Sequence, residues 1–125
     1  MKLLIVEDNP AIRQMMRRLV EDLAQEIYEC DDGAGALDAY REVQPDWVLM
    51  DLQMPRLNGL AATQQLLGYD PAAHVLIVTN YDDAALRNAA SEVGACGYIL
   101  KEDLFEVRAQ LQKTQTPPPA TTEIQ

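Results

Sequence analysis

The stretch Val48-Leu49-Met50-Asp51-Leu52-Gln53-Met54-Pro55 is the clearest sign of the fold, because an apolar run ends in a lone carboxylate and a turn with proline follows. Three other apolar runs end in polar groups. They are residues 3–6, followed by Glu7 and Asp8, residues 75–78, followed by Thr79, and residues 98–100, followed by Lys101. Open α/β sheets build their sites beyond the carboxyl ends of the strands, so we expect these groups to meet in one crevice.

Five strands are expected in all, the weakest of them over residues 26–30. The others are residues 2–6, 46–50, 74–79 and 97–100. Helical apolar spacing follows each strand. The first helix is expected to start at Asn9 and Pro10, and the second to cover residues 36–43 and end before Pro45. The third is expected to run from Asn58 to about Gly68 and the fourth from Asp82 to Gly94. A capping box of Asp103 and Glu106 is expected to start the fifth. This alternation predicts an α/β fold, a parallel sheet with helices on both faces.

The composition favours one globular domain of 125 residues. Ten basic residues against 20 acidic ones give a net charge of −10, which argues against nucleic acid as a direct partner and suits a metal cation or a basic partner surface. No apolar run approaches the roughly 20 residues of a membrane span. The N-terminus runs directly into a strand with no room for a signal peptide, so a cytoplasmic location is expected.

Several residues that can carry chemistry are interpreted as structural. Cys30 and Cys96 lack a CxxC spacing and are expected to be small buried hydrophobic residues. Met15 and Met16 are assigned to core packing rather than to a partner surface, and residues 31–32 to a turn and helix start rather than to metal binding. His74, the only histidine, begins a strand far from the predicted crevice, which argues against a catalytic or phosphate-carrying role.

The groups at the strand ends suit phosphoryl transfer. Glu7, Asp8 and Asp51 would repel one another without a cation, and an all-oxygen ligand set favours Mg²⁺. Asp51 would act as the nucleophile, the metal and Lys101 would balance charge on the transferred oxygens, and Thr79 would donate a hydrogen bond. The plainer interpretation, a set of solvated carboxylates, fits one acid better than three beside a lysine and a threonine.

Over residues 1–113 the chain resembles the receiver domain of two-component response regulators. The matching elements are residues 6–9, residues 51–55 with Gly59, residues 78–79 and residues 94–101. The resemblance implies a flavodoxin-like sheet with strand order 2-1-3-4-5. It also implies Mg²⁺ as the cofactor. Residues 114–125, rich in proline and threonine, are expected to be a disordered tail.

Carried over by position, the resemblance implies a role for each site residue. Asp51 would be the phosphoacceptor, Asp8 a direct Mg²⁺ ligand, Glu7 a ligand through water, and the backbone carbonyl of Gln53 a further ligand. Lys101 would contact the phosphoryl group. The expected switch pair is Thr79 and Tyr98. The expected tuning of the phosphate's lifetime involves Gln53, Asn80 and Tyr81.

Two positions depart from the family pattern. Asn80 stands where a small residue is usual, and its larger side chain is expected to narrow phosphoryl access or alter hydrolysis. Glu102 follows Lys101 where many members have proline, so a cis peptide is not expected there. Some DNA-binding regulators also carry an acidic residue after this lysine.

The resemblance implies a signalling module that catalyses only its own phosphorylation and dephosphorylation. Its expected partners are a histidine kinase or a histidine phosphotransfer protein, and a downstream target or fused output domain, with possible dimerisation on phosphorylation. The expected output face is the fourth helix, fifth strand and fifth helix. The chain can equally be the receiver part of a larger DNA-binding regulator. A haloacid-dehalogenase-like phosphatase would need an Asp where Gln53 stands, and a degenerate binding module would not need all five site residues.

Overall fold

The computed structural model describes residues 1–54 and 57–115. The expected disordered tail lies outside these residues from 116 onward, and its boundary remains a prediction. Five strands alternate with five helices and a short 3-10 turn, η1. The elements are β1 (Lys2–Val6), α1 (Pro10–Val20), β2 (Glu26–Cys30), α2 (Ala36–Val43), β3 (Trp47–Met50), α3 (Gly59–Tyr69), β4 (Val75–Thr79), α4 (Ala84–Val93), β5 (Gly97–Leu100), η1 (Lys101–Asp103) and α5 (Phe105–Gln115).

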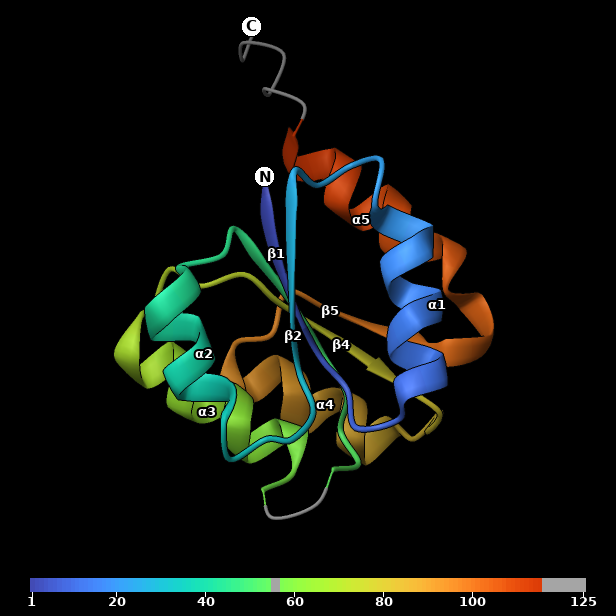
Figure 1. The fold of residues 1–125 in the computed structure, drawn as a ribbon. Coiled ribbons are helices and arrows are strands. Elements are labelled where there is room, and N and C mark those ends of the chain that lie inside the picture. The colour runs from blue at the N-terminus through green and yellow to red at the C-terminus, as the bar shows by residue number, and fades with distance from the viewer. Residues whose placement is uncertain (55–56, 116–125) are drawn as a thin grey trace, which may run out of the picture.

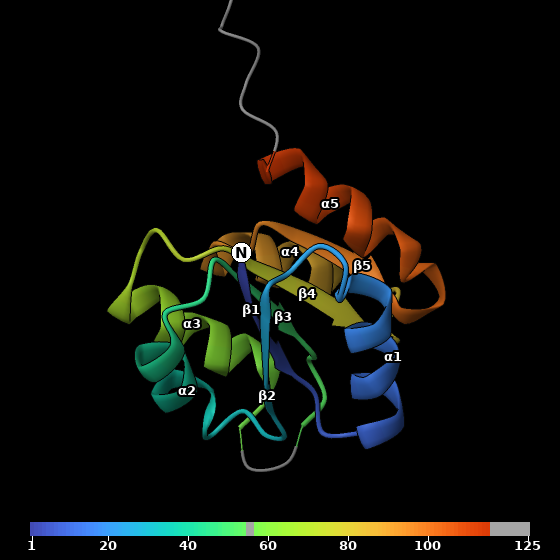
Figure 2. The same cartoon turned by 45° about the horizontal axis from the view of Figure 1, so that its top comes forward.

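The sheet is parallel throughout and has the order β2-β1-β3-β4-β5, which confirms the predicted fold class and strand order. Helices α1 and α5 cover one face, and α2, α3 and α4 cover the other (Figure 1, and turned in Figure 2). Every residue of β3 and β4 is buried, as expected for central strands of a sheet covered on both sides.

Two apolar clusters fill the space between the sheet and its helices. Alternate strand residues point to opposite faces, so Leu3 and Leu49 pack with α1 and α5, whereas Leu4 and Met50 pack with α2, α3 and α4. Both clusters reach to the ends of the central strands. The backbone at the carboxyl edge of the sheet is therefore held firmly on both faces.

Three helix starts show how local chemistry sets the element boundaries. Asn9 caps α1 by accepting hydrogen bonds from the amides of Ala11 and Ile12, as predicted. Asn58 caps α3 in the same way. The predicted cap of α4 is wrong by one residue, since Asp83 rather than Asp82 accepts the Leu86 amide.

The start of α5 also differs from the prediction. Residues 101–103 form the 3-10 turn, so the helix begins at Phe105 and Asp103 is not its capping residue. The strands predicted to begin at Asp46 and His74 begin one residue later. Both residues still take part in the sheet edge, since the Asp46 amide donates to the Lys2 carbonyl and the His74 carbonyl accepts the Val48 amide.

Two of the structural interpretations need correction. Met16 is buried in the core, but Met15 is 53% exposed. Cys96 is exposed and Cys30 only partly buried, so neither is a fully buried hydrophobic residue. Within the part of the chain that the structure describes, no helix is both long and apolar enough to cross a membrane.

Candidate functional site at the carboxyl edge of the sheet

The five polar groups predicted to meet lie at the carboxyl ends of four strands. The register of β1 with β3 pairs Val6 with Met50, so Glu7 and Asp51 follow side by side. The ladder continues past the strand ends, since the Asp51 amide donates to the Val6 carbonyl at 3.0 Å. Thr79 ends β4, and Lys101 follows β5 directly. The sheet topology therefore sets where these side chains stand.

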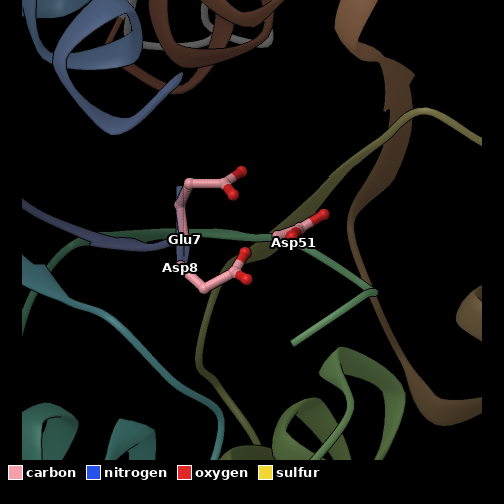
Figure 3. A group of neighbouring side chains, drawn as sticks. All are labelled: Glu7, Asp8 and Asp51. Carbon is pink, nitrogen blue, oxygen red and sulfur yellow. The ribbon is translucent and has the colours of Figure 1, made fainter. Parts of the chain in front are cut away.

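Three carboxylates converge at this edge. Glu7, Asp8 and Asp51 each offer an oxygen, and these oxygens all lie within 4.8 Å of one another. Figure 3 shows Glu7 and Asp8 leaving the end of β1 next to Asp51 at the end of β3. Glu7 and Asp51 are buried, whereas Asp8 is exposed, which leaves the cluster open to solvent on one side. This all-oxygen set fits a hard divalent cation such as Mg²⁺.

Lys101 bridges the two buried acids. Its Nζ lies 2.8 Å from Glu7 Oε1 and 3.3 Å from Asp51 Oδ1, and its side chain is itself mostly buried. Among the described residues, one lysine is thus ion-paired with two of the three carboxylates. The predicted meeting of Glu7, Asp8, Asp51 and Lys101 is confirmed as geometry.

The electrostatics of the cluster show that this compensation is incomplete. Burial raises the pKa of Asp51, and the charge of Asp8 adds to the rise, although Lys101 and the Gln53 amide act against it. Burial likewise raises the pKa of Glu7, with a further contribution from Asp51. Burial alone would lower the pKa of Lys101, but its two acidic partners together raise it. A bound cation would stabilise the ionised carboxylates.

The backbone around Asp51 needs a glycine that sequence reasoning noted only as part of a motif. A Cβ on Gly59 would lie 2.0 Å from the Asp51 carbonyl oxygen, and the Gly59 amide donates to the Leu52 carbonyl at 2.9 Å. The start of α3 therefore approaches Asp51 more closely than any side chain at position 59 would allow. Its place eight residues after the acid was the available signal.

Thr79 and Tyr98 both bind the backbone of Tyr81. The buried Thr79 hydroxyl accepts the Tyr81 amide at 3.2 Å, and the Tyr98 hydroxyl donates to the Tyr81 carbonyl. The Arg87 guanidinium lies over the Tyr98 ring, 4.4 Å from its centre. Sequence reasoning missed this connection, because the atoms at its centre are main-chain atoms that any residue at position 81 supplies.

The remaining predicted positions surround the cluster. Gln53 and Asn80 have exposed side chains. The backbone amide of Gln53 donates a hydrogen bond to the Asp51 carboxylate. Asp32 is buried and accepts the Gly35 amide at 2.8 Å before α2, in keeping with its interpretation as a turn residue. His74 lies at the opposite end of the sheet, where its ring stacks on Trp47.

Comparison with known proteins identifies the family. The sequence model of the protein family described as response regulator receiver domain matches residues 3–112 of this chain. A chemotaxis protein CheY from Halobacterium salinarum is 32% identical over 100 residues, covering 80% of this chain and 83% of that protein. The response regulator MprA from Mycobacterium tuberculosis is 33% identical over 119 residues, covering 91% of this chain but only 52% of that protein. The chain thus spans about half the length of several curated relatives.

Solved structures give the same result. A LuxR-family two-component response regulator from Aurantimonas has a TM-score of 0.79 and 34% identity, and the alignment covers 90% of this chain and 85% of that one. A DNA-binding LuxR-family response regulator from Staphylococcus aureus has a TM-score of 0.83 and 26% identity, with coverage of 92% and 98%. With the carboxylate cluster, the lysine and the strand order all in place, the chain belongs to the response regulator receiver domain family.

Proposed function

We propose that this receiver domain accepts a phosphoryl group on Asp51 and thereby changes the surface of α4, β5 and α5. The observation that carries this proposal is the cluster of Glu7, Asp8 and Asp51 joined to Lys101 at one edge of the sheet. The donor is a phosphohistidine, on a histidine kinase or a histidine phosphotransfer protein. Receiver domains are signalling domains, and the proposed chemistry is confined to the protein's own phosphorylation and dephosphorylation.

In the transfer step, an Asp51 oxygen attacks phosphorus, the phosphorus–nitrogen bond of the donor breaks, and the histidine nitrogen leaves with the bonding electrons. Asp51 must be ionised to attack, and its contact with Lys101 favours that form. Lys101 also stands where its ammonium can contact the oxygens of the transferred group. Thr79, at the end of the neighbouring strand, supplies a hydroxyl.

The donor set fits Mg²⁺, with Asp8 and Asp51 as direct carboxylate ligands. Glu7 is bound to Lys101 and to the Asn9 amide, which suits a contact with the metal through water. The Gln53 carbonyl is the proposed fourth protein group. When bound, the metal would balance negative charge on the phosphoryl oxygens.

The backbone of Tyr81 is the proposed link between phosphorylation and the output face. The Thr79 hydroxyl accepts a hydrogen bond from the Tyr81 amide. If the hydroxyl turns toward a phosphorylated Asp51, this hydrogen bond breaks. Tyr81 also holds the Tyr98 hydroxyl through its carbonyl, and Tyr98 in turn lies under Arg87 of α4. A shift of residues 79–81 would therefore change how Tyr98 and α4 pack.

Three positions at the mouth of the site are proposed to set the lifetime of the phosphorylated state. The exposed Gln53, Asn80 and Tyr81 stand one or two residues from Asp51 or Thr79. We expect Tyr81→Ala to hasten dephosphorylation because a bulky ring no longer shields the phosphoryl group from water. The decay of the phosphorylated protein over time, beside Tyr69→Ala as an exposed control, measures this effect; an unchanged or slower decay means that Tyr81 points elsewhere.

The donor is proposed to dock on an apolar groove between α1 and the start of α5. Met15 and Leu19 line one side, and Leu104 and Phe105 the other. Phe105 is 78% exposed, and Met15 is 53% exposed. Lys101 belongs both to this groove and to the acidic cluster, so a partner seated here stands beside Asp51.

A second candidate role is the receiver part of a larger DNA-binding regulator. It is favoured by relatives such as MprA, about half of whose length the chain matches, and by a similar structure described as a DNA-binding response regulator. In that case phosphorylation would act on a fused output domain, and dimerisation through the output face would be one route. A cytoplasmic location remains a prediction in either case.

The phosphoacceptor is tested with acetyl phosphate as a small donor. The intact wild-type protein is expected to gain the mass of one phosphate with Mg²⁺ and to gain none with EDTA. Asp51→Asn is expected to gain none under either condition, while Asp46→Asn, at the other edge of the sheet, behaves as the wild type. If Asp51→Asn still gains the mass of one phosphate, Asp51 is not the phosphoacceptor.

The switch is tested by NMR with beryllofluoride as a phosphoryl mimic. Amide shifts are expected around Asp51 and also over residues 82–111, and Thr79→Ala is expected to keep the first group while losing most of the second. Shifts confined to the loops around Asp51 would contradict the proposed coupling. Distal shifts that persist in Thr79→Ala would show that it does not run through Thr79.

A further inference from the structure

We infer that Arg13 is a positioning residue for the metal site, acting through the peptide group that joins Glu7 to Asp8. Its Nη1 donates to the Glu7 carbonyl at 2.8 Å, and its Nε donates to Glu29 Oε1 at 2.8 Å. The side chain thus runs from α1 across the β1–α1 turn to the end of β2. This inference rests on the proposed metal site and adds a residue that holds it in shape.

The turn between β1 and α1 is only three residues long, Glu7 to Asn9, and two of them carry candidate ligands. Its two ends are fixed. The Glu7 amide donates to the Cys30 carbonyl at 3.0 Å, and the Asn9 side chain caps α1. What these bonds leave open is the rotation of the peptide plane between Glu7 and Asp8.

Arg13 binds the carbonyl of that plane. Because the peptide group is planar, holding its oxygen also sets the position of the Asp8 Cα, the point from which the Asp8 side chain starts. Glu7 is already held through its carboxylate by Lys101 and Asn9. Asp8 is exposed, so its position beside Asp51 depends more heavily on the backbone. The arginine therefore acts on the ligand with the least support of its own.

The contact is geometric rather than a simple charge effect. Arg13 shares the Glu29 carboxylate with Arg17, so part of its charge is balanced before it reaches the acidic cluster. Its guanidinium has the planar fork needed to meet the carboxylate and the carbonyl together, which a lysine ammonium cannot do in the same way. Loss of the side chain should widen the range of Asp8 positions and weaken metal binding.

Arg17 provides a matched control on the same helix. It lies one turn further along α1, and its Nη1 is 3.1 Å from Glu29 Oε2. Its other hydrogen bonds go to the Ile27 carbonyl of β2, away from residues 7–9. Arg17→Gln therefore removes a cation bound to the same glutamate and leaves the peptide between Glu7 and Asp8 untouched.

The experiment is urea unfolding of the wild type, Arg13→Gln, Arg13→Lys and Arg17→Gln, in EDTA and at several Mg²⁺ concentrations. The EDTA curve measures the stability of the fold, and the increase with Mg²⁺ measures the dissociation constant of the metal separately. We expect Arg13→Gln to raise that constant by about ten-fold, the low end for a residue that supports a metal ligand. Arg13→Lys, which keeps the charge, should raise it by a smaller factor, and Arg17→Gln should leave it unchanged.

The outcomes separate this inference from the proposed function. If both glutamine variants lose stability in EDTA but bind Mg²⁺ as the wild type does, Arg13 only clamps α1 to the sheet and the inference is wrong. Tighter Mg²⁺ binding by Arg13→Gln would show that charge dominates, and the inference would again be wrong. If Arg13→Gln does not fold, Arg13→Lys decides, and an unchanged constant overturns the inference. A wild type whose stability does not respond to Mg²⁺ would instead remove the proposed metal site itself.

Discussion

The two ends of the central strands both carry carboxylates, but the acids at the amino end are held by neutral donors, whereas those at the carboxyl end gather around a lysine. At the amino end, Asp46 accepts the Lys2 amide at 2.7 Å, and Asp70 accepts the Tyr40 hydroxyl at 2.6 Å and the Ala72 amide at 3.1 Å. Burial raises the pKa of Tyr40, and its hydrogen bond to Asp70 adds to the rise. Each acid is held by its own neutral donors.

At the carboxyl end, Glu7, Asp8 and Asp51 lie together, and in the part of the chain that the structure describes Lys101 forms ion pairs with Glu7 and Asp51. Two of these acids are buried, and their raised pKa values show that the fold works against their ionisation. Satisfied acids at one end hold loops in place. Acids in excess of their cation at the other end create a site that a metal and a phosphoryl group can complete.

The largest effect on stability is expected from Lys101→Ala. Removing one partner from a buried ion pair leaves charge unbalanced and typically costs roughly 3 kcal/mol of unfolding free energy. Added Mg²⁺ should restore part of that loss, because it replaces the missing cation. Urea unfolding in EDTA and in Mg²⁺ measures both quantities. Lys2→Ala, which removes an exposed cation from the amino edge, is the control; a loss as small as that of the control would mean that the cluster tolerates its charge unaided.

The pH dependence of stability should differ with and without Mg²⁺. Asp51 and Glu7 have ordinary pKa values of 3.8 and 4.5, and both are raised in the folded protein. The folded state therefore holds more protons than the unfolded chain above these values, and these two acids lower the unfolding free energy as pH rises through the raised pKa values. Lys101 is fully protonated over this range, so its contribution there is constant.

Mg²⁺ binds the ionised carboxylates, so its stabilising effect should grow over the same range. Unfolding curves from about pH 4 to pH 7.5, an interval that starts near the ordinary carboxyl pKa values, measure the gap between Mg²⁺ and EDTA. In the wild type, the difference in unfolding free energy between Mg²⁺ and EDTA should widen as the pH rises. In Asp8→Asn, this difference should be smaller than in the wild type. A gap that stays constant with pH would show that the metal acts elsewhere.

A smaller effect is expected at the amino edge. Tyr40→Phe removes a hydrogen bond to a carboxylate and should lower the unfolding free energy by about 1.5 kcal/mol. Phosphorylation by acetyl phosphate should be unaffected, because the change lies at the far end of the sheet. Tyr69→Phe, on an exposed ring packed edge-on against Tyr40, is the matched control and should cost less. Slower phosphorylation of Tyr40→Phe would mean that the two edges are coupled.

Sequence patterns predicted the parallel strands and the meeting of the acids, because both follow from the alternation of strands and helices, whereas the strand order came from the family resemblance. A run such as residues 47–50 is fully apolar because it is buried on both faces, and Asp51 follows it directly. The start of α4 was less accessible because Asp82 and Asp83 are adjacent and either can cap a helix. The start of α5 was missed because a 3-10 turn occupies residues 101–103.

The contacts of the second layer could not be predicted. Arg13 reaches a main-chain carbonyl, and Tyr98 reaches another, and neither acceptor leaves a trace in the sequence. The exposure of Met15 was likewise hidden, because the apolar spacing of α1 includes both Met15 and Met16 and only the structure shows that Met16 alone of the two is buried.

The most direct test of the contrast between the two edges is a Mg²⁺ titration of the wild-type protein followed by two-dimensional NMR. Saturable amide shifts are expected for residues 7–9, 51–53 and 101. Residues at the amino edge, such as Tyr40, Trp47, Asp70 and His74, should not move. Saturable shifts at the amino edge, or none at residues 7–9 and 51–53, would contradict the claim that the unbalanced carboxylates form the metal site.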